Sequence, residues 1–301
     1  MEKELIRLLK KKGPLTGQEI WKSVGGQDLI LWRTCKLSKD LLIRTIGTRY
    51  LRLDRQVEGF ARLSPSIWRE FLTYSVVGIS GDPDPLEQKA RSVISHIEDV
   101  SKTKLELAWR IVSSLSSRLE SEWALDRQIC IIIAGDIVYN MAHDVPRPEK
   151  STGKTVKGSD MDLVVITDDT VSEDFIKRLD DAIFQEKYRL LITPHLKEEI
   201  DYVVKKIERV RSQIRFDTFK NMVACKILNE GAFLYGREDL FSTVKTMLRD
   251  HGVMKKLKDL EERARLMRND AEEYLLFEDP EQIRKESFNL FYPTEESDEF
   301  E

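Results

Sequence analysis

The decisive stretch of the sequence is Gly158-Ser159-Asp160-Met161-Asp162-Leu163-Val164-Val165-Ile166, where two acidic residues precede an apolar run. Successive side chains of a β-strand point to opposite faces, so Asp160 and Asp162 would share one face with their Cα atoms roughly 6.6 Å apart. The apolar residues that follow would anchor this strand in a core. Two like charges ~4 Å apart repel by on the order of 4 kcal/mol at an effective dielectric near 20, so the pair favours a cation beside it.

A divalent metal ion is the cation that suits such a pair. Hard divalent ions prefer oxygen ligands and commonly bridge carboxylates to a substrate phosphate, so we expect Mg²⁺ or Mn²⁺ and phosphoryl or nucleotidyl transfer. The same residues also fit a turn acid followed by a solvated acid at a strand edge. The segment Asp82-Pro83-Asp84 has the same spacing, but it stands between Gly81 and Pro85 and predicts a loop and a helix start.

The segments on either side of the acidic pair extend the pattern. The apolar run Gln128–Ala134 ends at Gly135 and is followed by the helix-compatible segment Asp136–Met141, which predicts a strand, a tight turn and a helix. Downstream, Glu199-Ile200-Asp201-Tyr202-Val203-Val204 offers a third acid beside apolar residues. Further on, the segment Ile227–Arg237 contains Glu-Gly-Ala-Phe-Leu-Tyr-Gly.

This order of parts, over roughly residues 127–240, resembles the DNA polymerase beta-like nucleotidyltransferase superfamily. In that family two or three carboxylates hold two metal ions, which bind a nucleoside triphosphate and activate the acceptor hydroxyl. The resemblance implies that Asp160 and Asp162 are catalytic metal ligands and that Asp201 is the third. The residues that it assigns to nucleotide binding are Gly135, Asp136, Gly158, Ser159 and Lys154.

The third ligand has an alternative. Apolar residues in the segment 200–210 also fit one face of a helix, on which Asp201 would be a solvated acid beside the apolar stripe. In that case Glu198 and Glu199 are the candidates for the third position.

Two features depart from the family. Its strand-to-helix turn usually carries Gly-Ser or Gly-Gly, whereas this chain has Gly135-Asp136, whose acid would repel phosphate unless it binds metal, points away or caps the helix. The polar insertion 144–155 is also longer than usual. It is either a loop that brings Lys150, Lys154 and Lys157 over the phosphates or a solvated insertion.

Other nucleotide and metal motifs are missing. The triplet Gly153-Lys154-Thr155 is not a P-loop, because Pro148 occupies the position of the required earlier glycine. The three cysteines and four histidines lack the spacing of a zinc site.

Composition limits the class of protein. The chain has 301 residues, of which 41% are apolar and 34% charged, enough for two domains with cores of their own. Isolated cysteines, no signal peptide and no long apolar run predict a soluble, cytoplasmic protein without a membrane segment. Residues 1–62 contain 14 basic and 7 acidic residues, a net charge of +7 within a total of −4, which favours a polyanionic partner for this segment.

The N-terminal segment predicts three helices. The first ends at Gly13-Pro14, and Thr16-Gly17-Gln18-Glu19 is a capping box that begins the second, which ends at Gly25-Gly26. Asp28 would cap a third helix that runs to about Lys39.

Two alternating segments, 42–46 and 49–53, follow across Gly47-Thr48 and predict a β-hairpin. Three helices and a basic hairpin resemble a winged helix-turn-helix, in which the third helix enters the major groove and the wing contacts the backbone. Winged helices also bind proteins, so that role remains open. The residues that the resemblance implies for nucleic-acid contact are Arg33, Lys36, Lys39, Arg44 and Arg49.

The remaining segments are predicted to be helical. Ser64-Pro65 predicts the N-cap and the first residue of one helix. A long helix is predicted after the break at Gly78–Pro85 and runs to about Trp123. Its apolar stripe suits core packing or a dimer seam. Asp239–Leu276 is charged and helix-prone, and Thr294–Glu301 is an acidic tail predicted to be disordered.

We therefore expect an α/β (α+β) protein with a small mixed-sheet nucleotidyltransferase domain, flanking helices and a preceding winged-helix domain. The expected boundaries are 1–63, 64–125, 126–240 and 241–301. The expected activity is metal-dependent transfer of a nucleoside monophosphate from a nucleoside triphosphate to RNA, protein, a small molecule or a nucleotide. The alternatives are a DNA-binding regulator whose transferase domain senses nucleotide or is inactive, and a toxin-type nucleotidyltransferase.

Overall fold

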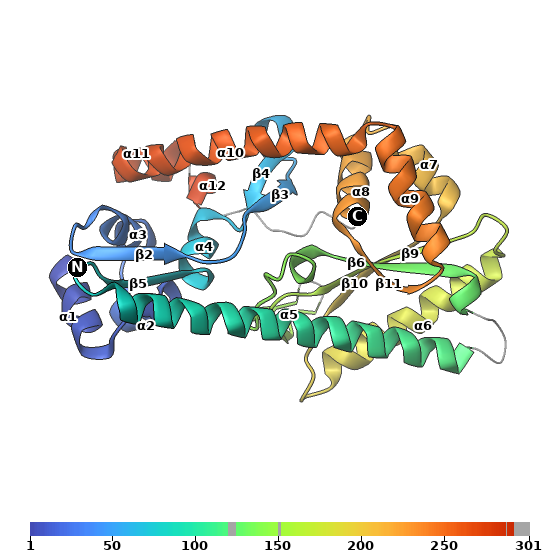
Figure 1. Cartoon of the computed structure of the whole chain (residues 1–301), viewed down its shortest axis with the longest axis horizontal. Coiled ribbons are helices and arrows are strands. Elements are labelled where there is room, and N and C mark those ends of the chain that lie inside the picture. The colour runs from blue at the N-terminus through green and yellow to red at the C-terminus, as the bar shows by residue number, and fades with distance from the viewer. Residues whose placement is uncertain (120–124, 150–151, 287, 292–301) are drawn as a thin grey trace. The chain divides into compact units, whose positions relative to one another are not determined.

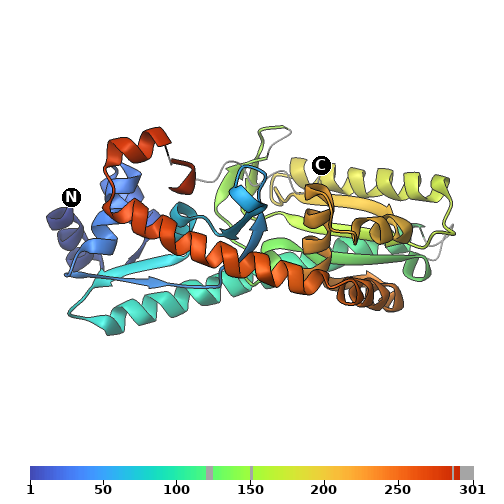
Figure 2. The same cartoon turned by 90° about the horizontal axis from the view of Figure 1, so that it is seen from above.

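The computed structural model describes residues 1–119, 125–149, 152–286 and 288–291 (Figure 1). Contacts divide the chain into two compact units: Met1–His96 groups with the described residues from Lys258 onward, and Ile97–Leu257 forms the second unit. The four segments expected from the sequence do not follow this division. Two helices, α5 (Pro83–Leu119) and α10 (Val253–Phe277), each contribute residues to both units. Helix α5 is continuous in Figure 1, and helix α10 is continuous in Figure 2.

The first unit begins with the three expected helices, α1 (Glu2–Lys12), α2 (Gly17–Val24) and α3 (Asp28–Leu37). Both hydrogen bonds of the predicted capping box are present, since the Thr16 hydroxyl accepts from the Glu19 amide and the Glu19 carboxylate accepts from the Thr16 amide. The N-cap of α3 is Gln27 rather than Asp28, which is the first residue of the helix.

The predicted hairpin between segments 42–46 and 49–53 is wrong. Strand β2 (Leu41–Thr45) pairs with β5 (Ser75–Ile79), and β3 (Tyr50–Leu53) pairs with β4 (Ala61–Ser64). Strand β5 lies between β1 (Leu15–Thr16) and β2 in a three-stranded antiparallel sheet. Because β5 is buried along most of its length, its backbone groups need a partner strand on both edges. The adjacent segment β3 then pairs with the next strand along the chain.

The predicted N-cap at Ser64 is also wrong. Ser64 is the last residue of β4, and helix α4 (Ile67–Thr73) is capped instead by Ser66, whose hydroxyl accepts a hydrogen bond from the Arg69 amide at 3.2 Å. Ser64 and Ser66 flank Pro65. Ser64 pairs with Tyr50 in the β3–β4 ladder, and Ser66 caps the helix.

The C-terminal segment completes the core of the first unit. Phe291, in α12 (Phe288–Phe291), lies 5.6 Å from Trp32 and 5.2 Å from Trp68 between ring centroids. Leu275 of α10 and Ile283 of α11 (Pro280–Glu286) are fully buried in the same cluster. Helix α10 therefore belongs partly to this unit, which the sequence pattern did not reveal.

The second unit is built on a four-stranded mixed sheet with the order β10-β9-β6-β11. Strand β10 is parallel to β9, and the other two pairs are antiparallel. This result confirms the expected mixture of helices with small mixed sheets. The four strands are β6 (Ile129–Ala134), β9 (Met161–Thr167), β10 (Ile200–Lys206) and β11 (Ala232–Gly236).

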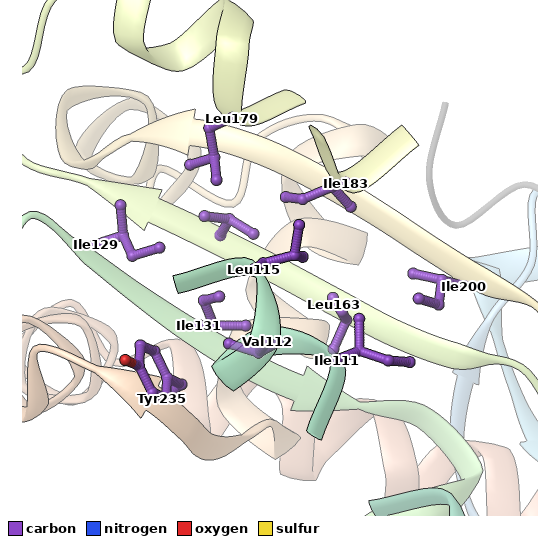
Figure 3. A pocket seen from close by; sticks show the side chains of 11 residues that line it. Ile111, Val112, Leu115, Ile129, Ile131, Leu163, Leu179, Ile183, Ile200 and Tyr235 are labelled. Carbon is purple, nitrogen blue, oxygen red and sulfur yellow. The ribbon is translucent and has the colours of Figure 1, made fainter. Parts of the chain in front are cut away.

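Helices cover this sheet. Helices α5 and α6 (Glu173–Ile192) pack against the face that carries Ile131 and Val165, and Figure 3 shows the small apolar cavity between them, about 10 Å³ in volume. A space of that size belongs to a packed core rather than to a ligand site. The remaining helices are α7 (Ile207–Gln213), α8 (Phe219–Glu230) and α9 (Glu238–Asp250).

The helices expected in segment 239–276 are present as α9 and α10. The expected helix up to Trp123 is described as far as Leu119, and the acidic tail 294–301 lies outside the described residues. In the ranges that the structure describes, none of the helices combines the length and the apolar character that a membrane span requires.

Candidate metal centre

Asp160, Asp162 and Asp201 meet at one end of the sheet. Asp160 directly precedes β9, and the parallel register of β9 and β10 places Asp162 opposite Asp201. One carboxylate oxygen from each of the three residues lies within 4.8 Å of the others. All three side chains are half-buried, so a bound ion would be shielded in part from water.

The helical alternative for segment 200–210 is wrong. Ile200–Lys206 is strand β10, and the helix that follows, α7, begins only at Ile207. Ile200 is buried and the rest of β10 is half-buried, as in an edge strand. The parallel pairing with the buried strand β9 supplies its backbone partners.

Gly135 makes room for the Asp162 carboxylate. Ala134 pairs with Asp162 across β6 and β9, and the next residue, Gly135, has a φ of +74°. A Cβ atom at Gly135 would lie 2.0 Å from Oδ2 of Asp162. Only glycine both accepts this backbone conformation and leaves the space that the carboxylate occupies.

The expected helix over Asp136–Met141 is wrong, because Gly135–Ile137 forms a single 3₁₀ turn. Asn140 has a left-handed φ of +53°, which an α-helix cannot accommodate, and the buried side chain of Met141 follows. The Asp136 carboxylate accepts a hydrogen bond from the Ser159 hydroxyl at 2.7 Å. The Asp136 carboxylate also raises the pKa of Asp160, so it lies near the three aspartates while it accepts this hydrogen bond.

Gly158 and Ser159 join the segment after this turn to the start of β9. The Ser159 amide donates to the His143 carbonyl at 2.9 Å, and the His143 amide donates to the Ser159 hydroxyl at 3.2 Å. Gly158 has a φ of +63°, and a Cβ there would lie 1.8 Å from the His143 carbonyl oxygen. These contacts fix the position of Asp160, which follows directly.

Among the described residues, the basic side chains of Arg147 and Lys187 contact the acids, and neither was expected from the sequence. Nη2 of Arg147 lies 3.3 Å from Asp160 and 2.8 Å from Glu199, and its Nε donates to the Gly158 carbonyl at 2.8 Å. Nζ of Lys187, in α6, donates to Oδ1 of Asp201 at 2.8 Å.

The insertion 144–155 supplies Arg147. Its ends form a hairpin of β7 (Pro146–Pro148) and β8 (Thr155–Lys157), and Arg147 is the middle residue of β7. An arginine between two prolines was a usable signal in the sequence, since each proline restricts the local backbone. Nothing in the pattern of α6 distinguishes Lys187 from other surface lysines.

The pKa values of Asp160 and Glu199 are both raised. Burial, together with the nearby carboxylates of Asp201 and Asp136, raises the pKa of Asp160, although Arg147 opposes the shift. Burial also raises the pKa of Glu199 to about 7, again against Arg147. Burial is the largest cause of both shifts and the neighbouring carboxylates add to it, so a cation beside these groups would stabilise their charged forms.

Lys154 and Lys157, the lysines of this region that the structure describes, have contacts away from the three aspartates. Nζ of Lys154 lies 5.7 Å from the centroid of the Tyr188 ring, and Nζ of Lys157 donates to the His195 carbonyl at 2.8 Å. Lys150 lies outside the described residues. Lys154 therefore stands beside α6 rather than over the acids.

The Glu-Gly-Ala-Phe-Leu-Tyr-Gly segment supports the sheet. A Cβ at Gly236 would lie 2.1 Å from the Ile129 carbonyl oxygen, so β11 needs glycine to approach β6. The Tyr235 hydroxyl donates to Ser116 at 2.8 Å, and Glu230 accepts from Tyr139 at 2.5 Å.

Two of the expected nucleic-acid contacts are engaged within the first unit. Arg33 donates to the carbonyl oxygens of Leu275 and Glu278. Arg49 donates to both carboxylate oxygens of Glu70 at 2.6 and 2.7 Å. These bonds use guanidinium donors inside the protein and argue against both residues as phosphate contacts.

Of the other three basic residues, Lys39 and Arg44 are exposed and Lys36 is half-buried. Lys36 lies 3.9 Å from Glu272, and Arg44 lies 3.4 Å from Glu87 in an exposed ion pair, a type that contributes little to stability.

A scan against models of known protein families gives no match, and no curated protein sequence matches the chain significantly. The residues and their geometry therefore carry the functional argument.

Proposed function

We infer that the second unit is a metal-dependent nucleotidyltransferase that transfers a nucleoside monophosphate from a nucleoside triphosphate to an acceptor hydroxyl. The observation that carries this proposal is the convergence of Asp160, Asp162 and Asp201, with oxygen atoms within 4.8 Å of one another. An all-oxygen donor set suits Mg²⁺ or Mn²⁺ rather than a softer metal. The space that Gly135 leaves beside Asp162, and the raised pKa of Asp160, fit such an ion.

The three aspartates would hold the metal, which supplies charge neutralisation for the triphosphate and a lower pKa for the acceptor hydroxyl. The acceptor oxygen would form a bond to the α-phosphorus, the bond from that phosphorus to the β-phosphate oxygen would break, and pyrophosphate would leave with its electron pair. The hydroxyl proton would pass to solvent or to a carboxylate of the cluster.

Arg147 and Lys187 would have two successive roles. Without metal they neutralise Asp160 and Asp201 through the contacts at 3.3 and 2.8 Å. A cation at the aspartates would compete for the same oxygens, which frees both side chains for phosphate oxygens, where arginine in particular makes paired hydrogen bonds.

The test is incubation of the full chain with each labelled nucleoside triphosphate, Mg²⁺ or Mn²⁺, and cellular RNA and protein. We expect label in a macromolecule, and none after chelation. Label that persists without metal would contradict the proposal.

A second candidate is a DNA-binding regulator whose transferase domain binds nucleotide without reaction. The pairing of Asp160 with Arg147 and of Asp201 with Lys187 favours it, because both acids have counter-ions without a metal. Nucleotide binding and duplex DNA binding without any transfer in the same assay would support this alternative.

Metal affinity should fall as the pH is lowered. The pKa of Glu199 is raised to about 7 and that of Asp160 is raised above its ordinary value, so the metal-free site takes up protons as the pH falls through 7. A cation must displace those protons, and its apparent Kd should therefore rise below pH 7. Mn²⁺ titration by calorimetry at pH 6, 7 and 8 measures the effect. In Glu199→Gln the dependence near pH 7 should become shallower, and an unchanged slope would exclude Glu199 as its source.

A further inference from the structure

The solvent face of α6 carries an unusual stripe of apolar side chains. Phe184, Tyr188 and Ile192 recur at every fourth residue and are 59%, 52% and 45% exposed. The opposite face of the same helix is buried in the core through residues that include Leu179 and Ile183. A surface helix normally presents polar residues to water, so a contiguous exposed stripe indicates a binding surface.

Cations surround this stripe. Lys154 lies over the Tyr188 ring, and Lys187 is three residues from Phe184, which makes the two side chains neighbours on the helix surface. Arg189 and Arg118 both contact the buried carboxylate of Glu186, so two positive charges share one negative charge. The cations therefore exceed the acids around Tyr188, whereas the exposed Asp180 and Asp181 lie one turn before Phe184.

The stripe is connected to the metal centre within one unit. Lys187 stands beside Phe184 on α6 and at the same time donates to Asp201 at 2.8 Å. A polymer bound along the stripe would therefore have an end within reach of the three aspartates.

We propose that this face of α6 binds a single-stranded nucleic acid and presents its terminal hydroxyl to the aspartate cluster as the acceptor. This inference rests on the proposed nucleotidyltransferase function and specifies its acceptor. Exposed rings accept unpaired bases by stacking, and interleaved cations accept the phosphates between them. A duplex hides the faces of its bases and cannot use the rings, so the charge and the rings together select a single strand.

The test measures binding without any transfer reaction, so its outcome does not depend on the proposed activity. A labelled 12-nucleotide single strand is titrated with the full chain, without divalent metal and at low salt, and fluorescence anisotropy reports the Kd. We expect Phe184→Ala and Tyr188→Ala each to weaken binding roughly tenfold, because each removes one stacking surface. Trp109→Ala is the matched control, since Trp109 is also an aromatic residue of the second unit with 52% exposure, and its Kd should equal that of the wild type.

Salt dependence provides a second readout. In Lys154→Gln the slope of log Kd against log salt should decrease by about 0.7, the value for one phosphate contact on a single strand. Undetectable binding by the wild type at low salt would overturn the proposal, and so would binding that both ring variants leave unchanged. A dimer in sedimentation velocity that becomes a monomer in the double ring variant would identify the stripe as an interface between two copies and overturn it as well.

A transfer measurement separates the two proposals. If the strand binds through the rings and is extended, the ring variants should raise the KM for the strand and leave Mn²⁺ affinity unchanged. If the wild type binds the strand through the rings but the labelled triphosphate is never incorporated, the transferase function fails while the binding surface stands.

Discussion

Asp162→Asn should abolish nucleotidyl transfer and Mn²⁺ binding while the protein remains folded. The substitution keeps the size of the side chain but removes a charge from the group of three aspartates whose oxygens lie within 4.8 Å. Changes in the residues that only orient metal ligands cost about 10- to 100-fold, so loss of a ligand should reduce transfer by more than about a hundredfold. Thermal unfolding should be unaffected or shifted upward without metal, because a repulsion between like charges is removed.

Asp82→Asn is the matched control for this variant. Asp82 belongs to the other Asp-x-Asp triplet, where it is exposed and directly precedes the first residue of α5, Pro83. It should leave both metal binding and transfer at wild-type levels. Transfer by Asp162→Asn within about tenfold of the wild type would exclude Asp162 as a metal ligand.

Local signals in the sequence predicted the parts of the fold that neighbouring residues determine. The capping box at Thr16 and Glu19 forms because its hydrogen bonds join residues three positions apart. The acidic pair and the apolar run after it predicted strand β9 and its approximate position for the same reason. Asp201 joins them because its strand is parallel to β9 in the register that places it opposite Asp162.

Pairings between distant segments could not be predicted in this way. Segments 42–46 and 49–53 alternate in polarity as strands do, but this alternation does not specify a partner strand. Strand β2 pairs with β5, about 30 residues further on. The burial of Phe291 beside Trp32 links residues from the two ends of the chain. Arg147 and Lys187 act on the acids through tertiary contacts at 2.8 to 3.3 Å, which no spacing along the chain encodes.

Gly135→Ala should weaken metal binding at least about tenfold by displacing one carboxylate. The new Cβ would lie 2.0 Å from Oδ2 of Asp162, so the carboxylate must move away from Asp160 and Asp201. The φ of +74° adds strain of about 1–2 kcal/mol for any residue with a Cβ, and unfolding should shift accordingly. Mn²⁺ titration and thermal unfolding measure the two effects separately.

Gly153→Ala isolates the carboxylate displacement from the backbone strain. Gly153 has a φ of +68°, close to that of Gly135, but no atom of the described residues lies within 4 Å of the position of its Cβ. Both variants should therefore lose a similar amount of stability, and only Gly135→Ala should lose Mn²⁺ affinity, by at least about tenfold as expected for a misplaced ligand. Equal Mn²⁺ affinity in the two variants would show that the metal does not depend on the position of Asp162. The two variants share the same backbone strain and differ in the contact with Asp162. Loss of Mn²⁺ affinity in Gly135→Ala alone would therefore show that Gly135 keeps the Asp162 carboxylate in place for the metal.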